Sequence, residues 1–278
     1  MSQNTRITEM SDTQELPVEQ KLLARRDGMV GEIVFNNPTR HNAVSLEMWQ
    51  RMHGLLEAFA ADPELRVLII SGAGGKAFVS GADISKFESE RASEEAVKTY
   101  NAASARVYEA LYNFPKPTIA KINGYCIGGG VNLAVCCDMR ICTVDAKFGI
   151  PAAKLGLGYG FPGVNRLTEI VGISRAMELF YTARQVPADE ALQIGLVNQV
   201  KSTDELDQFV AATARTISEN APLTVTTIKA VAREIGKPES RRDLGKLDQM
   251  VAQCFGSEDY IEGRRAFMEK RKPAFKGR

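Results

Sequence analysis

Histidine, paired cysteine and long apolar runs are what this chain has least of. It carries two histidines, His41 and His53, in 278 residues, and its five cysteines include no Cys-x-x-Cys pair. These counts disfavour a zinc site or a disulfide framework, and no metal site is expected. A Ser-His-Asp or Cys-His enzyme would have to use one of the two histidines, and neither lies in a nucleophile motif.

Net charge is also nearly absent. Lys and Arg number 35 against 34 for Asp and Glu, which leaves a formal charge of +1. This balance argues against a protein that holds nucleic acid by bulk positive charge. No run approaches the roughly 18 apolar residues of a membrane span. The sequence therefore predicts a globular protein with neither nucleic acid nor membrane as its partner, and its length fits one large domain or a domain with an appendage.

The N-terminal segment 1–20 is polar and includes Glu9, Asp12, Glu15 and Glu19. A secretory signal needs an apolar centre, and a mitochondrial presequence is rich in arginine and poor in acids. Neither description fits, so we expect a flexible tail and a cytoplasmic protein.

The segment 21–203 is predicted to be an α/β core. Two strands joined by a turn at Asp27-Gly28 are followed by a helix from Leu46 to about Ala61, with Ser45 as its N-cap. Strand, glycine loop and helix then occur twice in succession, which favours right-handed βαβ units on a mostly parallel sheet. The expected elements are strands 67–70, 118–122 and 140–143 and helices 93–112 and 131–139.

The C-terminal part is predicted to be almost entirely helical, with Leu196–Val200 as the only late strand. We place a boundary near residue 203, so that 204–278 forms a helical C-terminal region. Two of its expected helices are 240–254 and 257–269.

The first glycine loop reads Ile-Ser-Gly-Ala-Gly-Gly-Lys-Ala over 70–77. Gly72, Gly74 and Ala77 formally match a dinucleotide fingerprint after a strand, but no helix opens directly and no acid ends a second strand about 20 residues on. A phosphate-binding loop fails because Ala77 stands where Ser or Thr is required. A surface turn is the favoured interpretation.

The second loop carries three consecutive glycines, Gly128, Gly129 and Gly130, where a strand and turn lead into a helix. A helix N-terminus offers unpaired N–H groups, and glycine lets a ligand approach them closely. Such a site suits an anionic oxygen. Close packing of helix on strand explains the same glycines equally well, so both interpretations stay open.

Taken together, these segments resemble the crotonase (enoyl-CoA hydratase/isomerase) superfamily, over nearly the whole chain from about Leu22 to Phe275. Four stretches carry the resemblance, and their order and spacing make it specific: Asn-Pro-Thr-Arg-His-Asn-Ala at 37–43, Ala-Phe-Val-Ser-Gly-Ala-Asp-Ile at 77–84, Asn-Gly-Tyr-Cys-Ile-Gly-Gly-Gly at 123–130, and Glu-Lys-Arg-Lys-Pro-Ala-Phe at 269–275. The resemblance implies a spiral of ββα units with a helical C-terminal region, assembled as a homotrimer or hexamer.

The family binds acyl-CoA thioesters without a separate cofactor, coenzyme A being part of the substrate. It stabilises a thioester enolate with two backbone N–H groups, which by resemblance belong to Ala82 and Gly129. Losing one such donor typically costs about 3–4 kcal/mol of transition-state stabilisation.

Further substrate-binding positions follow from the same resemblance. The backbone around Ala43 and Ala82 is placed against the adenosine, and Arg40, Lys270 and Lys272 are candidates for the phosphates, although solvated surface charge explains these three as well. Asp83, Gly128 and Ala152 border the site. For Asp83 we expect a structural role, such as N-capping, rather than general-base catalysis.

The chain departs from the hydratases at the two positions that carry their glutamates. Asn132 stands two residues after the glycine triplet, and Ala152 follows Gly-Ile-Pro at 149–151. An alanine cannot move a proton, and an amide is not a useful base near neutral pH. The simple isomerases keep a carboxylate at the second position, and the dienoyl isomerases and dehalogenases carry an aspartate where this chain has Gly160.

A tyrosine, Tyr159, remains nearby in Leu-Gly-Leu-Gly-Tyr-Gly-Phe-Pro-Gly at 155–163, a stretch similar to that of the methylmalonyl-CoA decarboxylase branch. Decarboxylation needs no base, because the carboxylate leaves as CO2 and the enzyme stabilises the enolate. Tyr159 and Asn132 could serve as neutral donors. That branch has a histidine where this chain has Ala82, and a packed aromatic ring is the other interpretation of Tyr159.

Three hypotheses follow. The first is an acyl-CoA lyase acting through an enolate, most plausibly a decarboxylase of a malonyl-CoA-type substrate. The second is an enoyl-CoA hydratase or isomerase that takes its acid–base group from elsewhere, for example Glu88 or Glu90. The third is a non-catalytic protein that binds CoA thioesters. The acyl chain length is set by the segment 87–112 and the helices, and the sequence does not specify it.

Overall fold

The computed structural model describes residues 16–83, 86 and 92–278, in which two sheets and a helical shell form the core. The first sheet has six strands in the order β1-β2-β3-β5-β7-β10. These strands are β1 (Leu22–Asp27), β2 (Val30–Phe35), β3 (Val67–Gly72), β5 (Thr118–Ile122), β7 (Met139–Thr143) and β10 (Gln199–Lys201). The pair β1–β2 is antiparallel, as the Asp27-Gly28 turn predicts, and the other neighbours are parallel.

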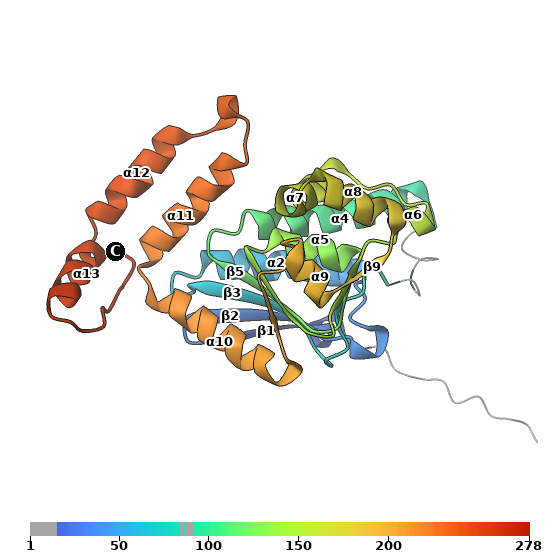
Figure 1. Ribbon diagram of the computed structural model, residues 1–278, viewed down its shortest axis with the longest axis horizontal. Coiled ribbons are helices and arrows are strands. Elements are labelled where there is room, and N and C mark those ends of the chain that lie inside the picture. The colour runs from blue at the N-terminus through green and yellow to red at the C-terminus, as the bar shows by residue number, and fades with distance from the viewer. Residues whose placement is uncertain (1–15, 84–85, 87–91) are drawn as a thin grey trace, which may run out of the picture.

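Helices cover both faces of this sheet (Figure 1). Alternate side chains of its strand β3 point to opposite faces, and the apolar side chains on each face pack against helices. Val67 and Ile69 of β3 pack with Leu206 of α10 (Thr203–Glu219), whereas Leu68 and Ile70 belong to the larger core on the other face. All four strand residues are buried. The strand expected at 67–70 is confirmed and is buried on both faces, and α10 lies on the six-stranded sheet.

The larger core is formed against α2 (Leu46–Ala61), α4 (Glu94–Tyr112) and α5 (Gly129–Cys136). Ser45 caps α2 by accepting a hydrogen bond from Met48 N–H, and Ser93 caps α4 in the same way. The helix expected over 131–139 begins earlier, at Gly129, and ends at Cys136. The reason is that Met139 already pairs with Ile119 in the sheet.

A second sheet of four strands, in the order β4-β6-β8-β9, was not predicted from the sequence. Its strands have three residues each: β4 (Ala77–Val79), β6 (Tyr125–Ile127), β8 (Lys147–Gly149) and β9 (Gln185–Pro187). The first two lie where glycine loops were expected, and β9 corrects the expectation that residues after 162 hold a single late strand. That late strand is β10, which begins later than the expected 196–200 because the N–H groups of Leu196 and Val197 donate to Ala191 O and not to a neighbouring strand.

The two sheets give the fold its repeat. A long strand of the first sheet is followed by a short strand of the second and then by a helix, as in β3-β4-α4 and β5-β6-α5. The expected spiral of ββα units is therefore the observed architecture. The turns at the carboxyl ends of the short strands bring separate parts of the chain together, and the candidate site lies there.

The remaining helices fall into two groups. Near the second sheet lie α6 (Ala152–Leu155), α7 (Phe161–Val171), α8 (Ile173–Thr182) and α9 (Ala188–Gln193), and α1 (Val18–Lys21) precedes β1. The helices α11 (Pro222–Ile235), α12 (Leu244–Phe255) and α13 (Glu258–Met268) extend away from the core (Figure 1). The helix expected from residue 240 begins at Leu244 because Asp243 caps it and residues 239–241 form a 3-10 turn. Among described residues, no helix is long and apolar enough to cross a membrane.

Candidate active site

The first half of the site is the turn that follows β4. Val44 forms a parallel bridge with Ala82: its N–H donates to Gly81 O at 2.9 Å, and its O accepts from Asp83 N–H at 3.1 Å. In a parallel bridge, the flanking residues make these bonds and the N–H of the bridged residue points the other way. The Ala82 N–H is thus directed away from Val44.

The second half is the turn from β6 into α5. Gly128 has φ of 55°, a left-handed conformation that glycine adopts without strain, and its N–H donates to Gly149 O at 2.8 Å. Gly129 is the first residue of α5, and the first N–H groups of a helix have no partner within the helix. The Gly129 N–H therefore belongs to the donor end of this helix.

The two turns lie against each other. A Cβ placed on Gly129 would be 3.8 Å from the Gly81 Cα, and one placed on Gly81 would be 3.9 Å from the Gly129 N. The structure thus brings together the two backbone segments that resemblance assigns to the oxyanion hole. Close packing of helix on strand, the other interpretation of the three glycines, applies to Gly130, because a Cβ there would overlap the Val79 carbonyl. Packing therefore accounts for Gly130, whereas a Cβ on Gly129 would lie 3.1 Å from the Tyr108 hydroxyl oxygen.

Three neutral polar side chains surround the Gly128-Gly129 turn. The Tyr159 hydroxyl donates to Gly128 O and the Tyr108 hydroxyl to Gly129 O, each at 3.4 Å. The Asn132 side chain hydrogen-bonds to Tyr108. It also lies beside Gly163, where a Cβ would be 2.9 Å from the Asn132 Oδ1 and 3.0 Å from the Tyr159 Cε1. A small residue at 163 therefore makes room for both Asn132 and Tyr159.

Both tyrosines are hydrogen-bond donors, not bases. Burial raises the pKa of Tyr108 well above its ordinary value, and the nearby Tyr159 adds to the shift while the hydrogen bond from Asn132 opposes it. Burial likewise raises the pKa of Tyr159, with smaller contributions from Cys126 and Cys136. Each phenol stays protonated throughout the neutral range.

Aromatic packing holds the two rings. Trp49 of α2 packs edge-to-face on Tyr108 with ring centroids 5.3 Å apart, and Phe180 of α8 packs on Tyr159 at 5.0 Å. Sequence reasoning missed Tyr108, which was included only in a segment thought to set chain length. Its signal was the helical spacing, because Ser104 and Leu111, four residues before it and three after it, lie on the same buried face.

Two residues of the stretch 37–43, Arg40 and Ala43, lie beside the Ala82-Asp83 turn. Asp83 is buried, and its Oδ1 lies 3.5 Å from the Arg40 Nη1. Ala43 is buried next to Val44 and therefore beside Ala82. The carboxylate of Asp83 is committed to an ion pair, in keeping with the structural role expected for it, whereas the expected N-cap concerns residues after it that lie outside the described part.

The substituted glutamate positions lie at the same turn. Asn132 is the fourth residue of α5, and Ala152 opens α6 directly after Pro151, whose ring lies 3.9 Å from a Cβ placed on Gly128. Glu88 and Glu90, the alternative acid–base candidates, lie outside the described residues. Glu109 of α4 is paired with Arg166 at 2.7 Å.

The C-terminal lysines lie elsewhere in this chain. Lys272 forms an ion pair with Glu219, at the end of α10, at 2.6 Å. Lys270 follows α13 with φ of 53°, and the residues beyond fold back onto this helix, where Asp259 accepts hydrogen bonds from the Lys276 and Gly277 N–H groups. Helix α13 lies apart from the helices around the site (Figure 1). One chain alone brings Arg40, but not these lysines, to the Ala82 turn.

Other candidate motifs are absorbed by the fold. A Cβ on Gly72 would overlap the carbonyls of Ala77 and Phe78, so the first glycine loop is a close-packed turn into β4. Cys126, Cys136, Cys137 and Cys142 are buried, reduced side chains. Within the described ranges, no group of three His, Cys, Asp or Glu side chains is arranged to hold a metal.

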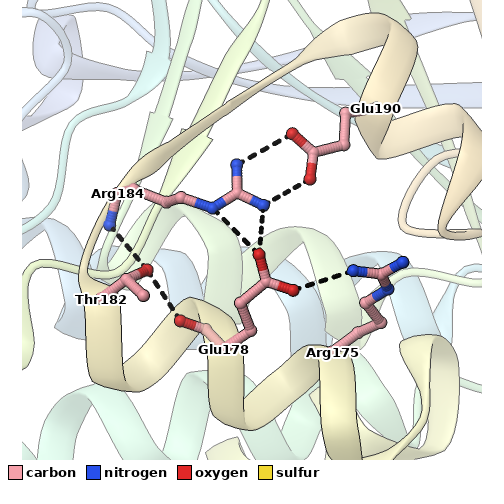
Figure 2. Close-up of polar contacts among 5 residues, drawn as sticks. All are labelled: Arg175, Glu178, Thr182, Arg184 and Glu190. Atoms are coloured by element: carbon pink, nitrogen blue, oxygen red, sulfur yellow. Dashed lines mark hydrogen bonds and ion pairs between the residues drawn. The ribbon is translucent and has the colours of Figure 1, made fainter.

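An ion-pair network secures the edge of the site-bearing sheet (Figure 2). Arg184, between α8 and β9, contacts Glu178 of α8 and Glu190 of α9, and Arg175 joins at 2.9 Å from Glu178. The Arg184 carbonyl faces Gly149 of β8. The hydrogen bonds from Arg184 and Arg175 lower the pKa of Glu178, so the network is charged at neutral pH.

Comparison with known proteins decides the family. The family model described as enoyl-CoA hydratase/isomerase matches residues 25–278. The chain belongs to the enoyl-CoA hydratase/isomerase family. This places it in the crotonase superfamily and makes an enzyme of acyl-CoA thioesters the expected activity class.

Individual relatives span nearly its whole length. A crotonyl-CoA hydratase from Syntrophomonas wolfei is 36% identical over 256 residues, covering 92% of this chain and 98% of the relative. A carnitinyl-CoA dehydratase from Escherichia coli O157:H7 is 34% identical, covering 94% and 100%. A crystal structure of an enoyl-CoA hydratase/carnithine racemase from Magnetospirillum magneticum superposes with a TM-score of 0.88 at 36% identity, covering 93% of this chain and 96% of that one.

Proposed function

We propose that this protein catalyses a reaction of an acyl-CoA thioester through an enolate, which the N–H groups of Ala82 and Gly129 stabilise. The observation that carries the proposal is the meeting of the Gly81-Ala82 turn with the first residue of α5. Two fixed backbone dipoles aimed at one point stabilise developing negative charge without reorganising. Ala43, Arg40 and Asp83 line the same turn and form the candidate CoA contact.

For the reaction itself, addition or elimination of water across the double bond of an enoyl-CoA is the first candidate. Its support is family membership and the hydratase and dehydratase names of relatives at 34–36% identity. Because positions 132 and 152 are Asn and Ala, the proton must be moved by another group. Glu88 and Glu90 are the candidates to mutate first. An isomerase that shifts the double bond would use the same enolate.

Decarboxylation is the second candidate, and one observation favours it. The side chains that surround the Gly128-Gly129 turn, Tyr108, Asn132 and Tyr159, are neutral donors, and both phenols stay protonated. A substrate carboxylate that leaves as CO2 needs an enolate site and no base. A malonyl-CoA-type thioester is therefore the alternative substrate.

Mass spectrometry of CoA products separates the candidates. Purified protein is incubated with crotonyl-CoA and methylmalonyl-CoA together. Addition of water to the first supports the hydratase, and Glu88→Gln and Glu90→Gln then identify the proton carrier. Loss of CO2 from the second supports the decarboxylase. Tight CoA binding without turnover of any thioester would contradict both and favour a binding protein.

Self-association belongs to the same proposal. The helices α11–α13 expose large apolar side chains, including Phe255, Ile261 and Phe267, and they line an open apolar pocket of about 660 Å³. Exposed apolar surface of this kind marks an interaction site, and a homotrimer or hexamer is proposed. Sedimentation would show a monomer if this were wrong.

A further inference from the structure

The peptide between Gly128 and Gly129 joins the candidate oxyanion donor to a tyrosine. Its carbonyl is Gly128 O, and its N–H is that of Gly129. The Tyr159 hydroxyl donates to this carbonyl at 3.4 Å, and the Asn132 N–H donates to it at 3.2 Å as the first hydrogen bond of α5. A carbonyl oxygen has two lone pairs, so it can accept both.

The next peptide has a similar arrangement without the same consequence. The Tyr108 hydroxyl donates to Gly129 O at the same distance of 3.4 Å. That carbonyl shares its peptide with the N–H of Gly130, the residue that is packed so closely on β4 that a Cβ would overlap the Val79 carbonyl. The two tyrosines are therefore a natural pair for comparison, since only one of them contacts the peptide that carries the Gly129 N–H.

Hydrogen bonds in a chain polarise one another. A donor on the carbonyl of a peptide draws electron density to the oxygen and leaves the N–H a stronger donor. The effect is larger in apolar surroundings, and Tyr159 is partly buried against the core with its ring packed on Phe180. Hydrogen bonds of catalytic sites are often long before the transition state forms and shorten in it.

We propose that Tyr159 is a positioning residue that acts through the Gly128-Gly129 peptide: its hydroxyl fixes and polarises this peptide so that the Gly129 N–H stabilises the enolate oxygen. This role differs from direct contact between Tyr159 and the acyl group. It rests on the proposed function, because it assumes that the Gly129 N–H receives the thioester oxygen.

A spectroscopic experiment tests the proposal. Cinnamoyl-CoA is bound to the protein, and the absorption of its conjugated thioester is recorded, since polarisation of the carbonyl by the oxyanion donors shifts this band to longer wavelength. Wild-type protein is expected to shift the band. Tyr159→Phe keeps the ring against Phe180 and is expected to reduce the shift, to lower kcat about five- to ten-fold and to change KM little. Tyr108→Phe removes the donor to the neighbouring peptide and is expected to reduce the shift less than Tyr159→Phe does, and Tyr181→Phe, at a 75% exposed tyrosine of α8, is the control expected to leave the shift unchanged.

A second variant is expected to increase the shift, and because it keeps the shape of the side chain, its effect does not come from a folding defect. Replacing Tyr159 by 3-fluorotyrosine keeps its shape and makes the phenol a stronger donor, so the shift is expected to increase. An unchanged shift in both Tyr159 variants overturns the inference. A large rise in KM with an unchanged shift does so too, because it indicates direct substrate contact. No shift in the wild-type protein with bound cinnamoyl-CoA instead contradicts the proposed function itself.

Discussion

The two sheets of this protein differ in what holds them together. The six-stranded sheet has four strands of five or six residues at its centre and is buried by helices on both faces. The four-stranded sheet consists of three-residue strands, two of which, β4 and β6, lead into glycine turns, and contacts from α5 and α9 complete it. The first is stable through its own apolar side chains. The second positions the site and depends on close backbone packing and on its neighbours.

The largest effect is expected from a substitution that creates a cavity between the six-stranded sheet and α10. Leu206→Ala removes a fully buried side chain between α10 and β3, and we expect a loss of about 3 kcal/mol in the free energy of unfolding. Turnover per folded molecule should stay within about twofold of wild type. Urea denaturation followed by fluorescence of the single tryptophan, Trp49, measures the first quantity.

The matched control is Leu192→Ala, because Leu192 of α9 is 45% exposed. Its cost should stay near about 0.5 kcal/mol. If Leu206→Ala lowered turnover per folded molecule by much more than about twofold, the six-stranded sheet would contribute to the site as well as to stability.

Gly130→Ala tests the four-stranded sheet. The added Cβ would overlap the Val79 carbonyl, so β4 and α5 must separate and the Ala82 and Gly129 N–H groups must move apart. We expect a loss of about 1–3 kcal/mol in stability and at least about a hundred-fold loss of kcat. Steady-state kinetics on the active substrate, with thermal unfolding in parallel, checks both.

Gly54→Ala provides the comparison for that change. Gly54 lies on the exposed face of α2, and nothing lies within 4 Å of an added Cβ. Alanine there should stabilise the helix by about 1 kcal/mol and leave kcat unchanged. Equal activities of the two variants would contradict the close-packing argument.

High pH tests how the buried cysteine thiols of the larger core affect the free energy of unfolding. Burial, partly offset by Arg166, raises the pKa of Cys136 to about 11, and burial raises that of Cys142 to about 12. Above the pKa of an unfolded thiol, the unfolded state releases the proton that the folded state keeps, so stability falls as pH rises. Each such thiol contributes up to about 1.4 kcal/mol per pH unit.

Urea midpoints between pH 8 and 11 measure this slope. Cys142→Ala should flatten it, even though the substitution also lowers stability at pH 8. A slope that the substitution leaves unchanged would show that the Cys142 thiol titrates alike in the folded and unfolded states.

The smallest effect is expected at the Arg184 network, which holds the edge strand β9 (Figure 2). Exposed ion pairs contribute little and are screened by salt. Arg184→Gln should lower Tm by about 2 °C at low ionic strength, and the difference should shrink in 0.5 M NaCl. Arg175→Gln removes only the outer pair and should change Tm less. A salt-independent loss would indicate that Arg184 acts by packing.

Much of the fold was predictable from the sequence because its signals are local. The Asp27-Gly28 turn, the Ser45 cap and the apolar run of β3 each specify an element through nearby residues, and all three are observed. The short strands β4, β6 and β8 gave no such signal. Three residues show no periodicity, and their pairing partners lie more than 20 residues away along the chain.

The candidate site divides in the same way. The glycines at 81 and 128–130 and the replacement of both glutamates, by Asn132 and Ala152, are visible in the sequence and limited the chemistry from the start. Tyr108 was not recognised, because the role of a tyrosine on a helix depends on the partner of its hydroxyl, and the sequence does not show that partner. For Tyr159 the sequence left two interpretations open, a donor to the substrate and a packed aromatic ring, and the structure adds that its hydroxyl donates to the Gly128 carbonyl.

The sequence by itself determined the family, the long strands and helices, and the absence of a carboxylate at positions 132 and 152. These depend on the identity of residues and on their spacing. Only the tertiary structure decided that two turns 48 residues apart meet at Gly81 and Gly129, and which peptide Tyr159 contacts. The physical reason is that backbone N–H groups are common to nearly all residues. Their use as a site depends on where long-range packing directs them.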